Sequence, residues 1–356
     1  MRYFSKHCCA VCRLVLSTLF IVFLSACSSP YIADDINEYQ QRLSRVLDTE
    51  LVSPASQAGL ASSLAYPTRN DLLKQPTSIG INLTQFHQLQ QCELGNLVAE
   101  HNTALGKIQH FSQRLHYEQQ FIAALNDCMT LANAAQSATN EWGKLTATMS
   151  QWQRIKQAEY PLHWSNMLVL SDETKAAFSR ARPALLYQDT IDIAGQVSLF
   201  KQVTALAEPQ YQPGQSIEAS LQAISASRLP ASIWLAQQHI ATQLPPITAA
   251  LKTQLTALDC TATTPEKANV LRNVFYLFFI DKIQPAGARI NAFTYQFAPV
   301  MNTWLASPAL PDSFKQYLRS QQRHFAAYQQ AMDDHVTLWQ GFLSRCNLSP
   351  VAPSSA

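Results

Sequence analysis

The C-terminal part of the chain carries the pattern that most restricts its fold. Between Asp312 and Cys346, large apolar side chains recur every three or four residues, which places them on one face of a single helix. The stripe consists of Phe314, Leu318, Phe325, Tyr328, Met332, Trp339, Phe342 and Cys346. The pattern therefore predicts a long amphipathic helix whose apolar face is packed against other elements.

The composition extends this expectation to the rest of the chain. Only 9 of the 356 residues are glycine, which disfavours β architectures dense in tight turns and also glycine-rich phosphate loops. Alanine, leucine and glutamine are abundant, and all three are good helix formers. We therefore predict an all-α fold, a multi-helix, bundle-like body that forms either one or two lobes.

Proline positions divide the other helical stretches. We expect Pro161 and Pro183 to interrupt helices, Pro245 and Pro246 to break or kink one, and Pro285 to bend another, because proline lacks the backbone N–H that a helix interior needs. The stretch Val270–Ile280 is apolar almost all round and is predicted to be a central buried helix. The expected helices cover about 34–51, 83–105, 113–135, 141–158, 172–180, 189–207, 217–226, 230–257, 265–283 and 312–346.

The segment 208–216 is the best internal boundary, because Pro209, Pro213 and Gly214 interrupt the helical pattern there. We predict a signal peptide at 1–26 and an N-terminal helix with a connecting segment at 27–78. Two helical lobes at 79–208 and 216–347 and a disordered tail at 348–356 complete the predicted organisation.

The first 27 residues have the features of a bacterial lipoprotein signal. Basic residues precede a short apolar run, and Leu24-Ser25-Ala26 leads directly to Cys27. The run from Leu14 to Ala26 is too short for an ordinary membrane span, which needs about 20 residues. We predict cleavage before Cys27 and acylation of its thiol, including palmitate, which attaches the protein to a membrane. Since Ser28 replaces the aspartate that retains lipoproteins in the inner membrane, we expect the outer membrane, on its periplasmic face.

Removal of the signal changes the charge of the protein. Residues 1–26 contain three of the 26 lysines and arginines and none of the 24 acidic residues, so the mature chain has 23 basic and 24 acidic residues and a net charge of −1. Such a chain, without basic clusters, argues against a nucleic-acid partner.

Four cysteines remain in the mature chain besides Cys27: Cys92, Cys128, Cys260 and Cys346. Three pairings are possible, and free thiols are the alternative. Residue 110 is midway between Cys92 and Cys128 and lies in a predicted turn, so an antiparallel hairpin would bring these two level. We therefore predict Cys92–Cys128 and Cys260–Cys346, as expected in an oxidising compartment. These four cysteines lack the Cys-x-x-Cys spacing typical of zinc sites, and no metal or cofactor is predicted.

No catalytic motif is recognisable, and no catalytic residue is predicted. Asp333, Asp334 and His335 are adjacent on a helix and so point in different directions. Glu118 and Arg114 are interpreted as an i,i+4 ion pair at the edge of the core. A group of four polar residues flanks the predicted turn near residue 110. Solvated side chains at helix ends are the simpler interpretation of these residues, although turns can carry function. The group consists of Glu100, His101, His110 and His116.

Several short segments resemble an uncharacterised family of gammaproteobacterial lipoproteins, known as a domain of unknown function. The resemblance covers the mature chain and implies no activity, cofactor or catalytic residue. Its segments are 39–47, Cys92-Glu93-Leu94-Gly95, Ala99-Glu100-His101-Asn102, Leu105-Gly106-Lys107, Ser112-Gln113-Arg114-Leu115 and Lys282-Ile283-Gln284-Pro285.

Three functional hypotheses remain open at this point. The leading one is a non-enzymatic lipoprotein that binds a protein partner in envelope assembly or maintenance. The others are an envelope enzyme acting on peptidoglycan or lipid and a carrier for a hydrophobic ligand.

Overall fold

The computed structural model describes residues 31–51, 64–104, 106–136, 142–188, 191–261 and 265–351. These residues form helices and contain no strand, which confirms the all-α prediction. Cys27, the signal segment and the last residues of the tail lie outside this range. In chain order the helical elements are α2 (Ile32–Leu47), α4 (Arg69–Leu72), α5 (Leu83–Leu89), α6 (Glu93–His101), η2 (Gly106–Ile108), α7 (Phe111–Gln136), α8 (Gly143–Leu170), α9 (Asp172–Ser179), η4 (Pro183–Tyr187), α10 (Ile193–Ala205), α11 (Ile217–Ser227), α12 (Leu229–Ala257), α13 (Glu266–Val274), η5 (Phe275–Ile283), α14 (Gln284–Ala306) and α15 (Asp312–Arg345).

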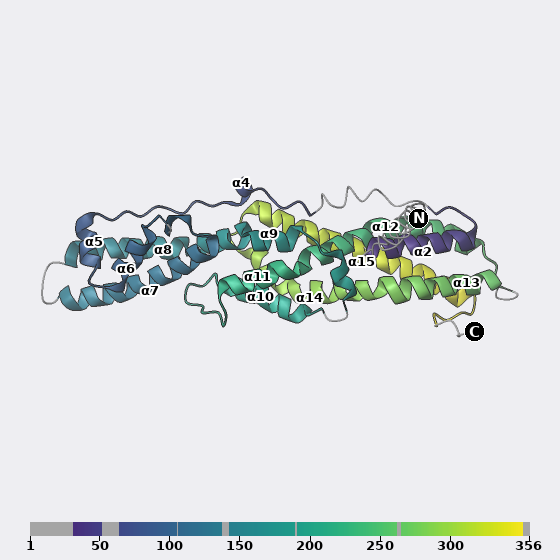
Figure 1. Cartoon of the computed structure of the whole chain (residues 1–356). Coiled ribbons are helices and arrows are strands. Elements are labelled where there is room, and N and C mark those ends of the chain that lie inside the picture. The colour runs from purple at the N-terminus through teal and green to yellow at the C-terminus, as the bar shows by residue number, and fades with distance from the viewer. Residues whose placement is uncertain are drawn as a thin grey trace, which may run out of the picture.

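The molecule is elongated, with its helices roughly along one axis (Figure 1). One end, which we call the arm, consists of α5, α6, α7 and the first half of α8. The rest, which we call the body, contains α2 and α9 to α15. An extended segment after α4 runs along the outside to α5 (Figure 1).

The body is organised around α15, which packs along α12. The predicted stripe of α15 faces this core: Phe314, Leu318, Tyr328, Trp339, Phe342 and Cys346 are buried, while Phe325 and Met332 are partly buried. The apolar period of the last helix is therefore satisfied by tertiary packing, as the sequence indicates.

The buried apolar side chains form two separate clusters, one in the body and one in the arm. Residues on both sides of the 208–216 boundary, such as Phe200 and Leu221, belong to the same body cluster. The arm cluster contains residues of α5 to α8, such as Leu94, Leu125 and Trp152. Packing thus separates the arm from the body rather than residues 79–208 from 216–347.

Several prolines predicted to end or bend helices lie within continuous ones. Helix α8 runs through Pro161, α12 runs through Pro245 and Pro246, and helical structure continues across Pro285 from η5 into α14. Each proline costs a backbone hydrogen bond. Neighbouring side chains such as Leu244 and Ile247 are nevertheless fully buried, so packing holds the helix where local propensity would end it.

The predicted single helix at 83–105 is instead two helices. After α5 the chain turns, and α6 begins with Cys92 as its N-cap residue. Gly95 permits this turn, because a Cβ at that position would lie 2.5 Å from the carbonyl oxygen of Leu89. Helix α7 begins at Phe111, two residues before the expected start at residue 113.

Two other helix predictions need correction. Helix α2 begins at Ile32, two residues before the expected start at residue 34, and ends at Leu47 rather than near residue 51. The apolar stretch 270–280 is not buried all round: Phe275 and Phe279 are buried, whereas Val270 and Leu277 are exposed. Part of it is the π-helix η5, which presents one face to α2 and the other to solvent.

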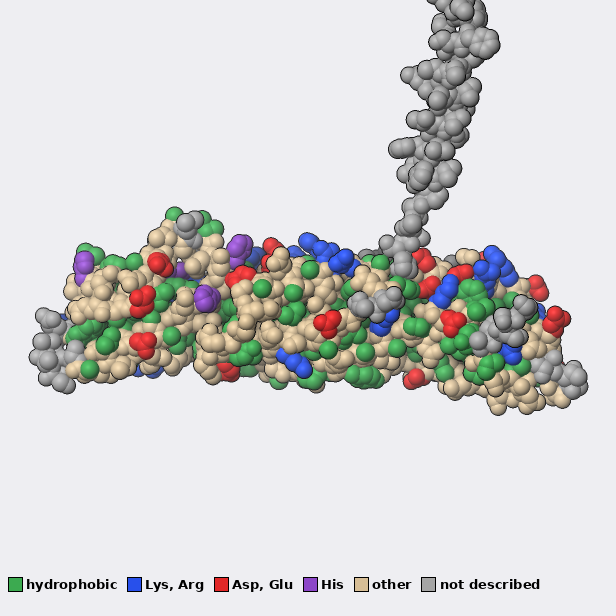
Figure 2. Space-filling model, turned by 60° about the horizontal axis from the view of Figure 1, so that its bottom comes forward, with side chains coloured by type: hydrophobic (Ala, Val, Ile, Leu, Met, Phe, Trp, Pro, Cys, Tyr) green, Lys and Arg blue, Asp and Glu red, His purple; other side chains and the backbone are tan. Residues whose placement is uncertain are grey.

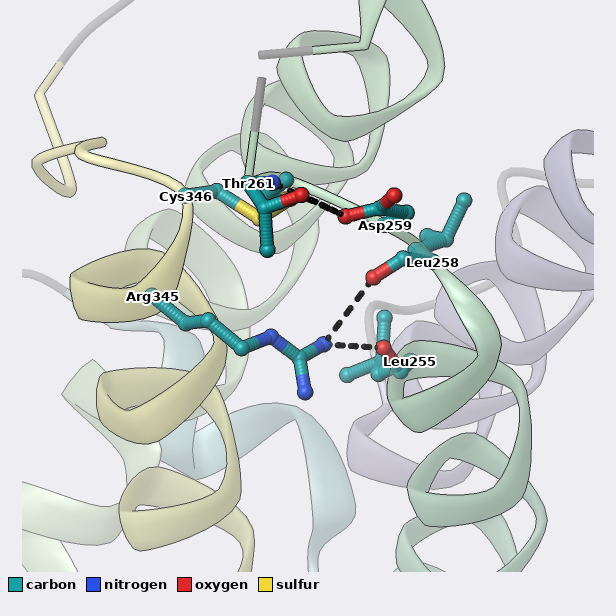
Figure 3. The surroundings of a disulfide bond; sticks show 7 residues. Leu255, Leu258, Asp259, Thr261, Arg345 and Cys346 are labelled. Atoms are coloured by element: carbon teal, nitrogen blue, oxygen red, sulfur yellow. Dashed lines mark hydrogen bonds between the residues drawn. A yellow bond between two sulfur atoms is a disulfide. The ribbon is translucent and has the colours of Figure 1, made fainter. Parts of the chain in front are cut away.

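Each predicted cysteine pair lies at disulfide distance. The Cα atoms of Cys92 and Cys128 are 5.6 Å apart in the arm, and those of Cys260 and Cys346 are 5.0 Å apart where α15 ends. Beside the second pair, the Arg345 guanidinium donates hydrogen bonds to the carbonyl oxygens of Leu255 and Leu258 at the end of α12 (Figure 3). These bonds satisfy carbonyls that a helix end leaves without intrahelical partners.

Candidate functional site

A buried group of charged side chains lies where the two clusters separate. Glu118 of α7 is 1% exposed, and its carboxylate accepts hydrogen bonds from the Lys156 ammonium of α8 at 2.7 and 3.0 Å. The Arg114 guanidinium lies 2.8 Å from one of its oxygens, and His163 Nε2 lies 3.6 Å from the same oxygen. One carboxylate therefore interacts with two cations and an imidazole.

The position of this group follows from the helix period. On α7, Leu115 and Ile122 belong to the body cluster, whereas Tyr117 and Phe121 belong to the arm cluster. Glu118 lies between them in sequence, as Lys156 of α8 lies between residues of the two clusters. This charged group, which we call the charged layer, thus lies where the two clusters meet on α7 and α8.

A pocket of about 460 Å³, which we call the junction pocket, opens beside this layer. The extended segment Pro76–Ile81 forms one wall, and residues of α6, α7 and α8 form the others. Polar lining comes from Thr77, Ser78, His101, Asn102, Arg114 and Lys156, and aromatic lining from Tyr117, Phe121 and Trp152.

The cations of the pocket are held against aromatic rings. The Arg114 guanidinium lies 5.2 Å from the centre of the Tyr117 ring and is hydrogen-bonded to His101, whose imidazole stacks on the same ring at 4.1 Å. The Lys156 ammonium lies 5.0 Å from the centre of the Phe121 ring. Such cation–π contacts and the Glu118 ion pairs fix both cations in position.

The pKa shifts of the acid and the imidazoles have different causes. Burial raises the pKa of Glu118, but the positive charges of Lys156 and Arg114 outweigh it and hold the pKa of this carboxyl below its usual value. Burial lowers the pKa of His163 to about 4, and burial followed by the Arg114 charge lowers the pKa of His101. At neutral pH the group therefore contains one carboxylate, two cations and two neutral imidazoles.

The structure brings together part of the polar group predicted near residue 110. Glu100, His101 and His116 line a second pocket of about 400 Å³, together with Glu218 of α11. His110 is exposed and does not line it. His101 belongs to both pockets, so this imidazole lies between them.

The Arg114–Glu118 pair agrees with the sequence interpretation, but Lys156 and His163 were not recognised as its partners. A signal for Lys156 was present, because it lies four residues from both Trp152 and Tyr160 and so shares their apolar face. A lysine at such a position requires a buried partner.

His335 lies in the body and is fully buried, as a hydrogen-bonded core residue. Its Nε2 accepts a hydrogen bond from the Trp339 indole at 3.1 Å and lies 3.0 Å from the Tyr39 hydroxyl. Its Nδ1 lies 2.8 Å from the Thr248 hydroxyl. Because the indole can only donate, the imidazole proton is on Nδ1, and burial lowers the pKa to about 3. Asp333 and Asp334 are exposed, so these two carboxylates lie in a different environment from the buried His335.

Two kinds of site are absent from the residues that the structure describes. No group of three or more His, Cys, Asp or Glu side chains there could hold a metal ion. No helix in those residues is both long and apolar enough to cross a membrane.

Comparison with known proteins places the chain in a family. The family model described as "Protein of unknown function (DUF3080)" matches residues 36–350. The chain belongs to this family. The match includes the arm, the body, both cysteine pairs and the charged layer at their junction. No curated protein and no solved structure matches.

Proposed function

We propose that this member of the DUF3080 family is a non-enzymatic lipoprotein, anchored to the outer membrane through acylated Cys27, that binds an envelope protein partner at the junction pocket. The observation that carries the proposal is the pocket itself, where fixed cations and aromatic rings line an opening beside the arm cluster and the charged layer. Fixed polar groups beside apolar walls are typical of binding sites.

The start of the described chain supports a close attachment to the membrane. Tyr31 is four residues after Cys27, and α2 begins at the next residue with Ile32, Ala33 and Ile36 in the body core. Four residues span at most about 14 Å. An acylated Cys27 would therefore hold the body near the bilayer surface.

The electrostatics favour binding over catalysis. A general base needs an available lone pair and a pKa near the working pH. Glu118 is ion-paired on both oxygens and its pKa is lowered, while His101 is hydrogen-bonded to Arg114. These groups hold one another in a fixed arrangement, which suits recognition of a ligand.

Site-specific photocrosslinking in cells tests the proposal. A crosslinking amino acid at Asn102, an exposed residue of the pocket lining, is expected to capture a reproducible envelope protein. Thr256, exposed near the end of α12 in the body, is the matched control and should capture none. Equal capture at both positions, or none at Asn102, would overturn the binding role.

The anchor has its own test. We expect membrane fractionation to find the protein in the outer membrane, and Cys27→Ala to abolish both this location and the Asn102 crosslink. Mature protein that is free in solution or in the inner membrane would contradict the anchoring proposal.

An envelope enzyme is the second candidate, because His101 lies between two pockets and next to Glu100. In that case, turnover of a peptidoglycan or lipid substrate would depend on the His101 imidazole. Replacement His101→Gln would abolish turnover if the enzyme hypothesis is correct, whereas it would only weaken capture of a partner if the protein is a binding protein.

A further inference from the structure

The charged residues that line the junction pocket are all basic. Arg114 and Lys156 are among the lining residues, whereas no aspartate or glutamate is. Their carboxylate partner, Glu118, is 1% exposed and lies behind them, outside the lining. The pocket therefore presents positive charge to whatever enters it.

The carboxylate does not neutralise both cations. Glu118 contributes one negative charge against two positive ones, and His101 and His163 are neutral at pH 7. Glu159, further along α8, does not line the pocket and accepts hydrogen bonds from the Thr77 backbone N–H at 2.9 and 3.0 Å. An excess positive charge in a partly dry site is costly unless an anion pairs with it.

The donors are already oriented for such an anion. Arg114 is held by Glu118, His101 and the ring of Tyr117, and these contacts use only part of its five N–H groups. Lys156 is 5% exposed and cannot move away from Glu118 without breaking the two hydrogen bonds that it donates to this buried carboxylate. Because the side chains are fixed before binding, a ligand loses little free energy in ordering them.

We propose that the junction pocket binds a ligand through a carboxylate or phosphate group, which Arg114 and Lys156 hold while an apolar part contacts Tyr117, Phe121 and Trp152. This inference rests on the proposed binding function and specifies the chemistry of its ligand. The aromatic residues form a wall on which such an apolar part can pack.

Calorimetric titration of the acylated mature protein in a non-ionic detergent tests this inference. The probes are benzoate, phenyl phosphate and benzamide, which share one ring but differ in charge. We expect at least one anion to bind about tenfold or more tightly than neutral benzamide, as a charged hydrogen bond would give. Benzamide binding as tightly as both anions would overturn the proposal.

Two variants locate the binding. Arg114→Gln should weaken anion binding by about tenfold or more, whereas Arg154→Gln, an exposed change on α8 outside the pocket lining, should leave it unchanged. Equal weakening in both variants would overturn the assignment to this pocket. Should Arg114→Gln fail to fold, salt dependence in the wild type decides: added salt should weaken anion binding and leave benzamide binding unchanged.

The two anionic probes distinguish the possible sources of the ligand. Preference for benzoate would indicate a carboxylate, as in an acidic peptide, and preference for phenyl phosphate would indicate a phosphate, as in a lipid headgroup. If neither anion binds but a protein is still captured at Asn102, the anionic ligand is rejected and the binding function is retained. Anion binding without capture at Asn102 would support the pocket chemistry and reject the proposed protein partner.

Discussion

The arm and the body are both helical and each contains one cysteine pair, yet they are held together differently. The body buries large aromatic residues such as Trp304 and Trp339 between long helices, and its core continues over many elements. The arm has a small cluster of its own, built from two short helices and parts of two long ones. A small core contributes little free energy, so the arm depends more on cross-links and on α7 and α8.

The junction explains how these unequal parts form one molecule. Helices α7 and α8 contribute residues to both cores, and where the two clusters meet the helices are joined by the ion pair of Lys156 and Glu118. Charged hydrogen bonds are directional, so this layer can fix how the two helices are aligned. On the face of the body that Figure 2 shows, basic and acidic side chains are interspersed.

The largest difference in stability between body and arm should come from replacing one large buried side chain in each core by alanine. Trp304→Ala in the body should cost about 3–5 kcal/mol and lower the unfolding midpoint of the whole chain. Leu145→Ala in the arm should cost about 2–5 kcal/mol, mainly by local opening of α5 and α6. Hydrogen exchange measured by mass spectrometry distinguishes global from local loss. Equal loss of protection throughout both variants would show that arm and body unfold as one unit.

Breaking the charged layer should have a similarly large effect at the junction. Glu118→Gln leaves two cations without a carboxylate, which should cost about 3–5 kcal/mol in urea unfolding. The double variant Glu118→Leu with Lys156→Met removes one cation as well and should be less destabilised. A double variant that is less stable than Glu118→Gln would contradict this account.

Removing each cysteine pair compares the cross-links directly. The paired replacements Cys92→Ser with Cys128→Ser and Cys260→Ser with Cys346→Ser should each cost about 2–4 kcal/mol. Their sequence separations are 36 and 86 residues, so the longer loop should cost about 0.8 kcal/mol more on chain entropy alone. Non-reducing peptide mapping is the prior check, and a peptide linking Cys92 to Cys260 would refute the pairing.

The buried histidines predict an acid-sensitive stability. Burial lowers the pKa of His335 to about 3 and those of His239 and His163 to about 4. Because the unfolded chain has histidine pKa values near 6.5, it binds protons first as the pH falls. Stability should therefore be complete above about pH 6.5 and decline toward pH 4, by about 1.4 kcal/mol per pH unit for each histidine.

Urea unfolding between pH 7.5 and 4.5 measures this slope. His163→Gln should reduce the slope of the unfolding free energy against pH by the contribution of about one proton. His116→Gln, which changes an exposed residue, should leave the slope unchanged. Identical slopes in wild type and His163→Gln would show that His163 titrates normally in the folded protein.

The smallest effects should come from matched helix caps. The Asn82 side chain accepts a hydrogen bond from the Gln85 backbone N–H at 2.9 Å in the arm, and Ser216 accepts one from Ala219 at 3.1 Å in the body. Either replacement by alanine should cost about 1 kcal/mol. In the arm the loss should appear as faster exchange of α5 alone. Faster exchange in the body on Asn82→Ala would mean that the arm is not a separate cooperative unit.

Much of the local structure could be predicted from the sequence. The bounds of α9, α11 and α15 follow from apolar period and caps, and both cysteine pairings follow from hairpin geometry and compartment. The continuation of α8 through Pro161 could not be predicted, because buried packing outweighs the local cost of proline. The turn before α6 also depends on a close approach of Gly95 to Leu89, which no local pattern reveals.

The sequence by itself determined the all-α class, the long C-terminal helix, the Arg114–Glu118 pair and the prediction of a lipid anchor at Cys27. These features depend on the order of neighbouring residues, which a helical period or a short motif records. Only the tertiary structure decided that two cores exist, that Lys156 completes the charged layer, and that an aromatic pocket with basic side chains opens beside it. Those features join residues from different helices, and their positions depend on packing along the whole chain.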